Sequence, residues 1–345
     1  MSAAAAAAKT KKPDLVELLS AKVKGQADAI RQIAPYIQMY EVGLAPEGRP
    51  AGVFLLLGPT GTGKTRTVEA LAEVLHGSKK NVLKIDCGEF QMDHEVAKLI
   101  GAPPGYLGHR ETQALLTQQR LSAVTSESCD VALVLFDEIE KAAPSLTRLL
   151  LGILDKATLR LGDNSTVNFE KTLIFLTSNL GSQEMMKAIT PDFGFQSGMA
   201  RERTDLNGKL EGIGVAAVRK RFSPEFVNRI DAVITYKPLG AESLDAIVDQ
   251  HLDELQYQIT SRMGERAFEI VVGEEARAFL VEKGTSPHYG ARELKRAIHR
   301  SLTQPLAAQV ANGEITPGSV VFVDVTVDGQ SLCLRAETQL KALAA

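Results

Sequence analysis

One glycine-rich segment constrains the fold of this chain more than any other. Residues 58–65 read Gly-Pro-Thr-Gly-Thr-Gly-Lys-Thr, and they follow the apolar run 53–57. The next segment, 66–75, carries apolar residues at helical spacing, so a buried strand, a tight loop and a helix are predicted in succession. Glycines let backbone N–H groups curl around an anion, and the helix N-terminus adds the positive end of its dipole. The segment therefore predicts a phosphate-binding loop.

Each residue of this loop has an expected part in binding a nucleoside triphosphate. Lys64 would place its charge on the β- and γ-phosphates, and the Thr65 hydroxyl would ligate Mg²⁺. The predicted nucleotide-binding residues of the loop are Gly58, Pro59, Thr60, Gly61, Thr62, Gly63, Lys64 and Thr65. An ordinary glycine-rich turn would explain the glycines, but it would not explain a Lys-Thr pair between a strand and a helix. The predicted cofactors are thus ATP and Mg²⁺.

Two carboxylates follow a second apolar strand. Residues 131–136 are wholly apolar and lead directly into Asp137 and Glu138. The carboxyl ends of parallel strands meet at one edge of a sheet, where the phosphate loop is also expected. We expect Asp137 to hold Mg²⁺, directly or through water, and Glu138 to act as the general base on the attacking water. Asn179 follows the next apolar strand and is a candidate to orient that water, although a simple turn would also explain a Ser-Asn pair.

Two arginines are candidates for contact with phosphate. Arg292 lies at the start of a predicted helix, where its charge opposes the helix dipole unless a bound phosphate attracts it. A solvated arginine explains this position equally well. Arg229 precedes the last predicted strand of the sheet and has the form of an arginine finger that reaches a neighbouring subunit's γ-phosphate. A structural salt bridge to Asp231 or Glu225 is the alternative, and the residues alone favour it.

Strands and helices alternate along the first part of the chain. Apolar segments predict four more strands, at 81–86, 130–136, 172–177 and 232–236. Helical patterns lie between them, and another at 15–42 precedes the first strand. This alternation is typical of a parallel sheet with right-handed crossovers, so the predicted fold class is α/β.

The pattern changes after residue 238. Helices are predicted at 242–262, 274–283 and 290–313, and two strand-like segments flank Asp328-Gly329, which favours a hairpin. We predict a disordered or tag-like N-terminus at 1–12, a large α/β ATPase domain at 13–238 and a smaller, mainly helical C-terminal domain at 239–345 that ends in a β-hairpin. The polar, glycine-containing stretch 196–214 predicts a mobile loop.

Composition excludes several classes of protein. The net charge is −3, and no patch combines basic with aromatic residues, so a nucleic-acid partner is not expected. Three scattered cysteines suit a reducing compartment, and the N-terminus lacks the features of a secretory signal. No apolar run reaches about 18 residues, so no membrane span is expected. These features predict a cytoplasmic protein.

Taken in order, these segments resemble AAA+ ATPases of the Clp type, which are protein unfoldases, and in particular their second ATPase ring. The resemblance covers roughly 15–318. It rests on the glycine-rich loop, on Gly-Ala-Pro-Pro-Gly-Tyr-Leu-Gly at 101–108, Phe-Asp-Glu-Ile-Glu-Lys-Ala at 136–142, Thr-Ser-Asn-Leu-Gly at 177–181, Phe-Ser-Pro-Glu-Phe-Val-Asn-Arg-Ile-Asp at 222–231 and Tyr-Gly-Ala-Arg at 289–292. It implies a chaperone-like homo-oligomer, a hexameric ring with ATP between subunits, that acts on protein substrates.

The resemblance also implies roles for single residues. Asn179 matches the sensor-1 position, Arg229 the trans-acting finger and Arg292 the sensor-2 arginine. Val23 lies in a segment, 23–26, that matches the lining of the adenine pocket.

The segment 101–108 matches the axial pore loop, with Tyr106 and Leu107 between two glycines. An aromatic side chain exposed on a flexible loop can grip an unfolded chain by apolar contact, without sequence preference. Tyr106 folded back onto the core is the alternative. After this loop the family often has a pair of glycines, whereas this chain has His109 to Gln113, which implies a loop of different stiffness or charge. Phe193-Gly194-Phe195 resembles the loop by which some Clp unfoldases dock onto a protease chamber, which implies such a partner.

Two functions of different classes remain open at this point. The first is an ATP-driven ring motor that unfolds, threads or remodels proteins through a central pore. The second is an ATP-gated assembly or scaffolding module that does not translocate a substrate. ATP hydrolysis that protein substrates stimulate would separate the first from the second, and stimulation by DNA would favour a nucleic-acid motor instead.

Overall fold

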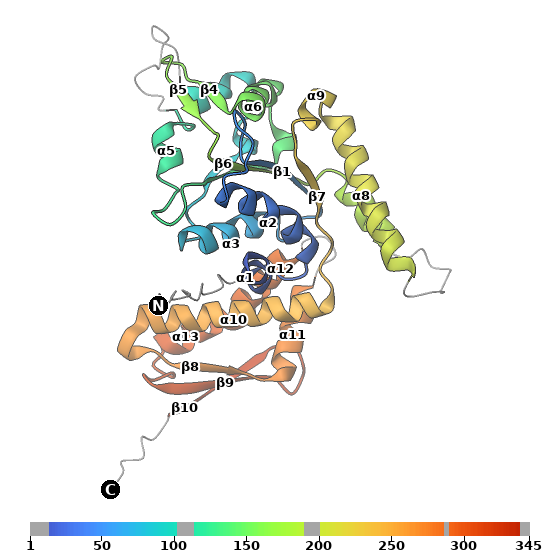
Figure 1. Cartoon of the computed structure of the whole chain (residues 1–345). Coiled ribbons are helices and arrows are strands. Elements are labelled where there is room, and N and C mark those ends of the chain that lie inside the picture. The colour runs from blue at the N-terminus through green and yellow to red at the C-terminus, as the bar shows by residue number, and fades with distance from the viewer. Residues whose placement is uncertain (1–13, 102–113, 190–200, 286–289, 339–345) are drawn as a thin grey trace, which may run out of the picture. The chain divides into compact units, whose positions relative to one another are not determined.

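The structure is a computed structural model that describes residues 14–101, 114–189, 201–285 and 290–338 (Figure 1). The strands are β1 (Gly52–Leu57), β2 (Leu83–Asp86), β3 (Ala132–Asp137), β4 (Thr158–Arg160), β5 (Thr166–Asn168), β6 (Thr172–Ser178), β7 (Ala232–Thr235), β8 (Glu269–Val272), β9 (Ser319–Val325) and β10 (Leu332–Thr338). The α-helices are α1 (Leu15–Lys22), α2 (Ala27–Glu41), α3 (Lys64–His76), α4 (Ala97–Ile100), α5 (Gln118–Ser122), α6 (Pro144–Lys156), α7 (Ser182–Ile189), α8 (Arg201–Arg221), α9 (Pro224–Val227), α10 (Ala241–Met263), α11 (Glu274–Gly284), α12 (Ala291–Ile298) and α13 (Gln304–Ala311). Short 3₁₀ helices are η1 (Cys87–Glu89), η2 (Asp93–Val96), η3 (Ile139–Lys141) and η4 (Gly264–Arg266), and η5 (His299–Thr303) is a π-helix.

A five-stranded sheet with the order β2-β3-β6-β1-β7 carries the site. Every residue of β1 and of β6 is buried, as expected of strands that are covered on both faces. β3 pairs in parallel with β2 and with β6, and Phe136 lies opposite Leu176. This register places the residues that follow β3 beside those that end β6. The five strands predicted for the sheet, and the α/β fold class, are confirmed.

The chain packs into two compact units. Unit 1 runs over Met1–Leu56, Lys64–Ser178 and Val218–Ile234, and unit 2 over Leu57–Gly63, Asn179–Ala217 and Thr235–Ala345, as far as their residues are described. In unit 1, α3 packs on the sheet against β3 and β6. The predicted domain boundary at residue 238 stays a prediction.

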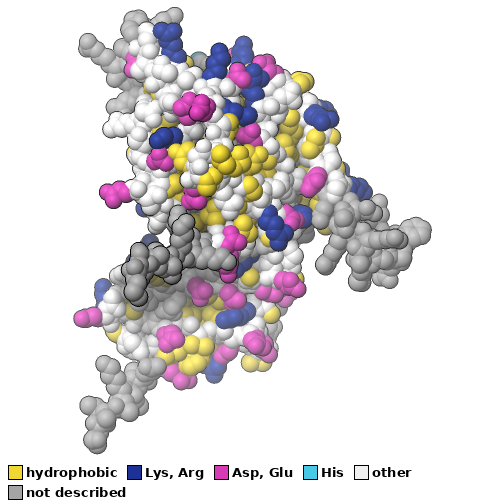
Figure 2. Space-filling model, viewed as in Figure 1, with side chains coloured by type: hydrophobic (Ala, Val, Ile, Leu, Met, Phe, Trp, Pro, Cys, Tyr) yellow, Lys and Arg dark blue, Asp and Glu magenta, His cyan; other side chains and the backbone are white. Residues whose placement is uncertain are grey.

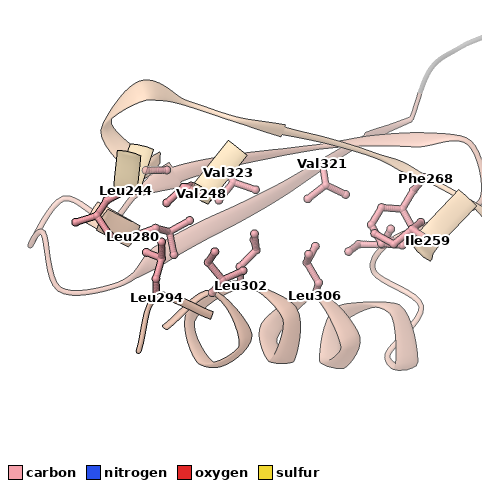
Figure 3. Packing of buried hydrophobic residues seen from close by; sticks show 13 residues of the cluster. Leu244, Val248, Ile259, Phe268, Leu280, Leu294, Leu302, Leu306, Val321 and Val323 are labelled. Atoms are coloured by element: carbon pink, nitrogen blue, oxygen red, sulfur yellow. The ribbon is translucent and has the colours of Figure 1, made fainter. Parts of the chain in front are cut away.

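In unit 2, a second sheet has the order β10-β9-β8. β9 and β10 are antiparallel and are joined through Asp328-Gly329, so the predicted hairpin is confirmed. β8 pairs in parallel with β9 and was not predicted, because four residues with no strong alternation give a weak signal. Figure 3 shows Val321 and Val323 of β9 facing a hydrophobic core that helices complete from the other side.

One prediction, that of a mobile loop at 196–214, was wrong. The stretch predicted as a mobile loop is helical from residue 201 onward, within α8, while 190–200 lie outside the described residues. A Cβ atom built on Gly181 would lie 3.3 Å from Ala217 Cβ and 3.4 Å from Ile213 Cγ2, so α8 packs closely there. Tertiary packing of this kind overrides the low helix propensity of the glycines in α8.

The predicted helix 290–313 is present over residues 291–311, where α12, the π-helix η5 and α13 follow one another without a break. Pro305 lacks a backbone N–H and cannot complete a regular helical hydrogen bond, which fits the change of helix type just before it. Among the described helices, none combines the length with the apolar character that crossing a bilayer requires.

Candidate active site

The glycine-rich loop leaves β1 with the backbone conformation that its glycines allow. Gly58 and Gly61 have φ angles of 141° and 77°. A Cβ atom at Gly58 would lie 2.6 Å from the carbonyl oxygen of Tyr236, so no larger residue fits at this close approach. The buried Thr62 hydroxyl donates a hydrogen bond of 2.9 Å to the carbonyl oxygen of Pro59, which closes the loop on itself.

Lys64 and Thr65 follow the loop as the first two residues of α3. The helix is held by its buried apolar side, which includes Val68 and Leu71. Lys64 is only 8% exposed, so water screens little of its charge. A helix N-terminus, a glycine cradle that a Cβ would fill, a buried ammonium group and an adjacent hydroxyl together fit a phosphate group with its Mg²⁺.

The two predicted carboxylates form a corner with one threonine of the neighbouring strand. Thr177, which is 1% exposed, donates from its hydroxyl to Asp137 Oδ1 at 2.5 Å. The hydroxyl oxygen of Thr177 in turn accepts the backbone N–H of Glu138 at 3.0 Å. Glu138 has φ 57° and ψ 51°, a left-handed conformation that costs a residue other than glycine free energy. The threonine therefore fixes both the Asp137 side chain and the Glu138 backbone.

Each carboxylate of this corner also forms an ion pair. Lys84 Nζ of β2 lies 2.9 Å from Asp137 Oδ2, and Lys141 Nζ lies 2.5 Å from Glu138 Oε2. The hydrogen bond to Glu138 and the charge of that carboxylate raise the pKa of Lys141. Both lysine side chains are about half exposed, and exposed ion pairs contribute little stability, so either lysine can give way to a more strongly bound partner. Asp137, together with Thr65, is suited to hold Mg²⁺, which prefers oxygen ligands.

One thiol lies near these carboxylates. Burial raises the pKa of Cys87, and the negative charges of Asp86 and Asp137 raise it further. Cys87 is therefore a neutral, inert thiol near pH 7 rather than a nucleophile.

Arg229, the predicted finger, is held within unit 1 by acidic residues. Its Nε lies 3.4 Å from Asp155 Oδ1, its Nη2 lies 3.3 Å from Glu225 Oε1, and its Nη1 donates to the Glu225 carbonyl oxygen at 3.0 Å. The alternative of a salt bridge to Glu225 is thus present, whereas Asp231 pairs with Arg49 at 2.8 Å instead. Contact of Arg229 with a neighbouring subunit stays a prediction.

In unit 2, the structure brings the start of α12 to the phosphate loop. The backbone N–H of Ala291 donates to the carbonyl oxygen of Gly61 at 3.2 Å, and the exposed Arg292 follows one residue later. Asn179 lies in the turn between β6 and α7, where its carbonyl oxygen accepts the N–H of Ser182 at 3.2 Å. The sensor roles of Arg292 and Asn179 stay predictions.

Some predicted residues are not part of these contacts. Val23 caps the C-terminus of α1 and is 4% exposed, and its place in an adenine pocket stays a prediction. Tyr106 and Leu107, like Phe193-Gly194-Phe195, lie outside the described residues.

Sequence reasoning missed three residues of the site: Thr177, Lys84 and Lys141. Thr177 belongs to the polar end of a predicted strand, but only the pairing of β3 with β6 shows that it meets Asp137. Lys84 likewise needs the pairing of β2 with β3. Lys141 lies three residues after Glu138, a spacing that could have indicated the pair.

Comparison with known proteins gives matches along most of the chain. Residues 49–233 match the family model described as the AAA domain (Cdc48 subfamily), and residues 239–323 match that of the C-terminal, D2-small domain of ClpB protein. Chaperone protein ClpB of Meiothermus ruber is 38% identical over 309 residues, which are 90% of this chain and 34% of that protein. The ClpB of Vibrio cholerae is 36% identical over 309 residues, 90% of this chain and 33% of that protein.

A solved structure is also similar. A closed-state cryo-EM reconstruction of Hsp104 with ATPγS and FITC casein matches with a TM-score of 0.75 and 28% identity, over 93% of this chain and 51% of that one. This chain spans about a third of the length of the two ClpB proteins. The predicted resemblance to the second ATPase ring of Clp-type proteins is confirmed by these matches. The model of the AAA domain matches more than half of the residues of this chain, and the chain therefore belongs to the AAA ATPase family.

Proposed function

We propose that this chain binds ATP with Mg²⁺ and hydrolyses it. We also propose that it does so in a homo-oligomeric, hexameric ring, which uses the hydrolysis to unfold or thread protein substrates through a central pore. The single observation that supports hydrolysis best is the corner where one buried threonine hydroxyl binds both Asp137 Oδ1 and the Glu138 backbone N–H. This arrangement presents one carboxylate for a metal and a second for a water molecule.

The residues of the chain divide the chemistry between them. Backbone N–H groups of the loop and the Lys64 ammonium group would hold the phosphates and balance their charge. Mg²⁺, held by Thr65 and Asp137, would supply neutralisation of the charge that develops on the phosphates. Glu138 would accept the proton of the attacking water once its carboxylate leaves Lys141, while Asn179 would orient that water. Arg229 of one subunit would complete the site of its neighbour, and Arg292 would contact the phosphates from its own chain.

The threading part of the proposal is supported by the relatives. ClpB is named a chaperone protein, and the Hsp104 reconstruction holds casein, a protein. The pore-loop match at Tyr106 and Leu107 agrees with such a substrate. Figure 2 shows acidic and basic side chains interspersed over one face, which gives no support to a nucleic-acid partner. Docking onto a protease chamber through Phe193-Gly194-Phe195, and a cytoplasmic location, complete the proposal.

The test compares two neighbouring carboxylates. Glu138→Gln keeps the shape of the side chain but removes the base, so ATP should still bind while kcat falls about 10²-fold or more. Glu140→Gln, two residues away in η3, is the matched control and should hydrolyse ATP at nearly the wild-type rate. Lys64→Ala should abolish binding itself. The measurements are phosphate release and the binding of a fluorescent ATP analogue. If Glu138→Gln hydrolyses ATP within a few-fold of the wild-type rate, Glu138 is not the base.

A further inference from the structure

The first residues of α12 lie directly against the outer side of the phosphate loop. Ala291 N–H donates to Gly61 O at 3.2 Å. A Cβ atom at Gly290 would lie 3.0 Å from the carbonyl oxygens of both Thr60 and Gly61. These residues all belong to unit 2. A backbone hydrogen bond therefore joins two segments that are more than 220 residues apart in the sequence.

Gly290 meets two conditions that only glycine satisfies here. Its φ of 52° and ψ of −142° lie in a region that residues with a side chain rarely adopt. In addition, a methyl group would have to push the loop carbonyls away by a few tenths of an ångström, because 3.0 Å is shorter than a normal contact between carbon and oxygen.

The helix α12, which makes this contact, is anchored in the core of unit 2. Leu294 and Ile298 of α12 are 0% and 5% exposed and belong to the cluster shown in Figure 3. A Cβ atom at Gly284, the last residue of α11, would lie only 2.5 Å from Leu294 Cδ1, so the two helices pack very closely. A close-packed interior resists small displacements, and α12 thus offers the loop a rigid support.

The direction of the carbonyl groups in this contact also determines the direction of the N–H groups of the loop. In a trans peptide, the carbonyl oxygen of one residue and the N–H of the next point in opposite directions. Because the carbonyl oxygens of Thr60 and Gly61 are turned toward α12, the N–H groups of Gly61 and Thr62 are turned away from it. Ala291, which binds the carbonyl oxygen of Gly61, therefore fixes the direction of the next N–H group of the loop, that of Thr62.

We propose that Gly290 is a positioning residue for nucleotide: it lets α12 hold the phosphate loop in the conformation that binds phosphate, and it links the loop to the core of unit 2. This inference rests on the proposed function. According to this inference, nucleotide affinity depends on the contact of α12 with the loop as well as on the loop itself.

The test uses two glycines with nearly the same backbone. Gly264 has φ 55° and ψ −120°, and a Cβ atom there would meet nothing within 4 Å. Gly290→Ala and Gly264→Ala should both lower the Tm of the chain without nucleotide, because the strain of a positive φ is shared, and Gly290→Ala should lower it further because its methyl group also displaces the loop carbonyls. The state of the loop is measured by the affinity for fluorescent ADP and by the KM and kcat of ATP hydrolysis.

Gly290→Ala should weaken ADP binding about tenfold or more, as expected when one hydrogen bond to a charged phosphate is lost, while Gly264→Ala should change the affinity by less than about twofold. In Gly290→Ala, the KM for ATP should rise more than kcat falls, since this substitution does not alter the carboxylate corner. Equal affinities of the two variants would overturn the inference. If the wild type itself binds no nucleotide, the proposed function fails instead.

A measurement on the wild type covers the case in which Gly290→Ala does not fold. Hydrogen exchange of the Ala291 amide should slow when ADP is added, together with the amides of Gly61 and Thr62, because a filled loop holds the carbonyl to which Ala291 donates. Unchanged exchange at Ala291, with protection of the loop amides, would overturn the inference.

Discussion

Replacing Thr177 with valine removes one hydroxyl from the carboxylate corner and keeps the shape of the side chain. Two hydrogen bonds disappear: the one to Asp137 Oδ1 at 2.5 Å and the one from Glu138 N–H at 3.0 Å. A lost bond to a charged group costs about 1.5–3 kcal/mol, and an unsatisfied backbone N–H about 1–3 kcal/mol. Asp137 keeps its ion pair with Lys84 and is 17% exposed, so water can replace part of the loss.

We therefore expect Thr177→Val to lower the free energy of unfolding by about 2–4 kcal/mol, measured by urea denaturation. The loss of the bond that fixes Glu138 should also displace the predicted base. A displacement well below 1 Å is enough to lower kcat about 10-fold or more. The KM for ATP should change little, because the phosphate loop is not altered.

Two variants serve as controls. Thr177→Ser keeps the hydroxyl and should retain most of the activity. Thr172 begins the same strand, is 2% exposed and donates to the Phe169 carbonyl oxygen at 2.6 Å. Thr172→Val should cost about 1 kcal/mol of stability and leave kcat unchanged. The reasoning is refuted if Thr177→Val hydrolyses ATP like the wild type, or if Thr172→Val loses as much activity.

Two further predictions concern the ring. Tyr106→Ala should leave ATP hydrolysis nearly intact but abolish unfolding of a tagged fluorescent reporter, since each engaged loop loses about 1–3 kcal/mol of apolar contact with the substrate; a parallel fall of both activities would make Tyr106 a structural residue. Arg229→Ala should bind ATP but hydrolyse it poorly, and mixing it with Lys64→Ala should restore some hydrolysis, because an intact Lys64 site can then meet an intact Arg229 of a neighbour. No recovery in verified mixed rings would favour a purely structural role, in the salt bridges to Asp155 and Glu225.

The parts of the fold that could be predicted are those with strong local signals. Fully apolar strands such as β1 and β6 stand out between polar segments, and the glycine-rich loop combines a spacing with specific residue types. Asp137 and Glu138 were found for the same reason, because they interrupt an apolar run at its end. The weak signals were misread: the glycines of α8 hid a helix that tertiary packing stabilises, and β8 is only four residues long.

Other features of the site depend on contacts between distant segments. Thr177 could be recognised only after the order of the strands placed β6 beside β3. Gly290 lies in the segment Tyr-Gly-Ala-Arg, one of those that carry the resemblance, but its close approach to Thr60 and Gly61 is visible only in the structure. Arg229 is an intermediate case: a salt bridge to Asp231 or Glu225 was the stated alternative, and the structure shows the one to Glu225 together with an unpredicted one to Asp155.

The left-handed backbone conformation of Glu138 lowers the stability of the chain, although the side chain at this position serves the proposed activity. Glycine would adopt this conformation without strain, so a glycine at this position would relieve about 1 kcal/mol, yet it would remove the carboxylate that we propose as the base. Selection for a more stable chain alone would therefore favour loss of the glutamate, and selection for turnover must oppose it. Libraries screened only for thermal stability should accumulate inactive chains with glycine or asparagine at position 138.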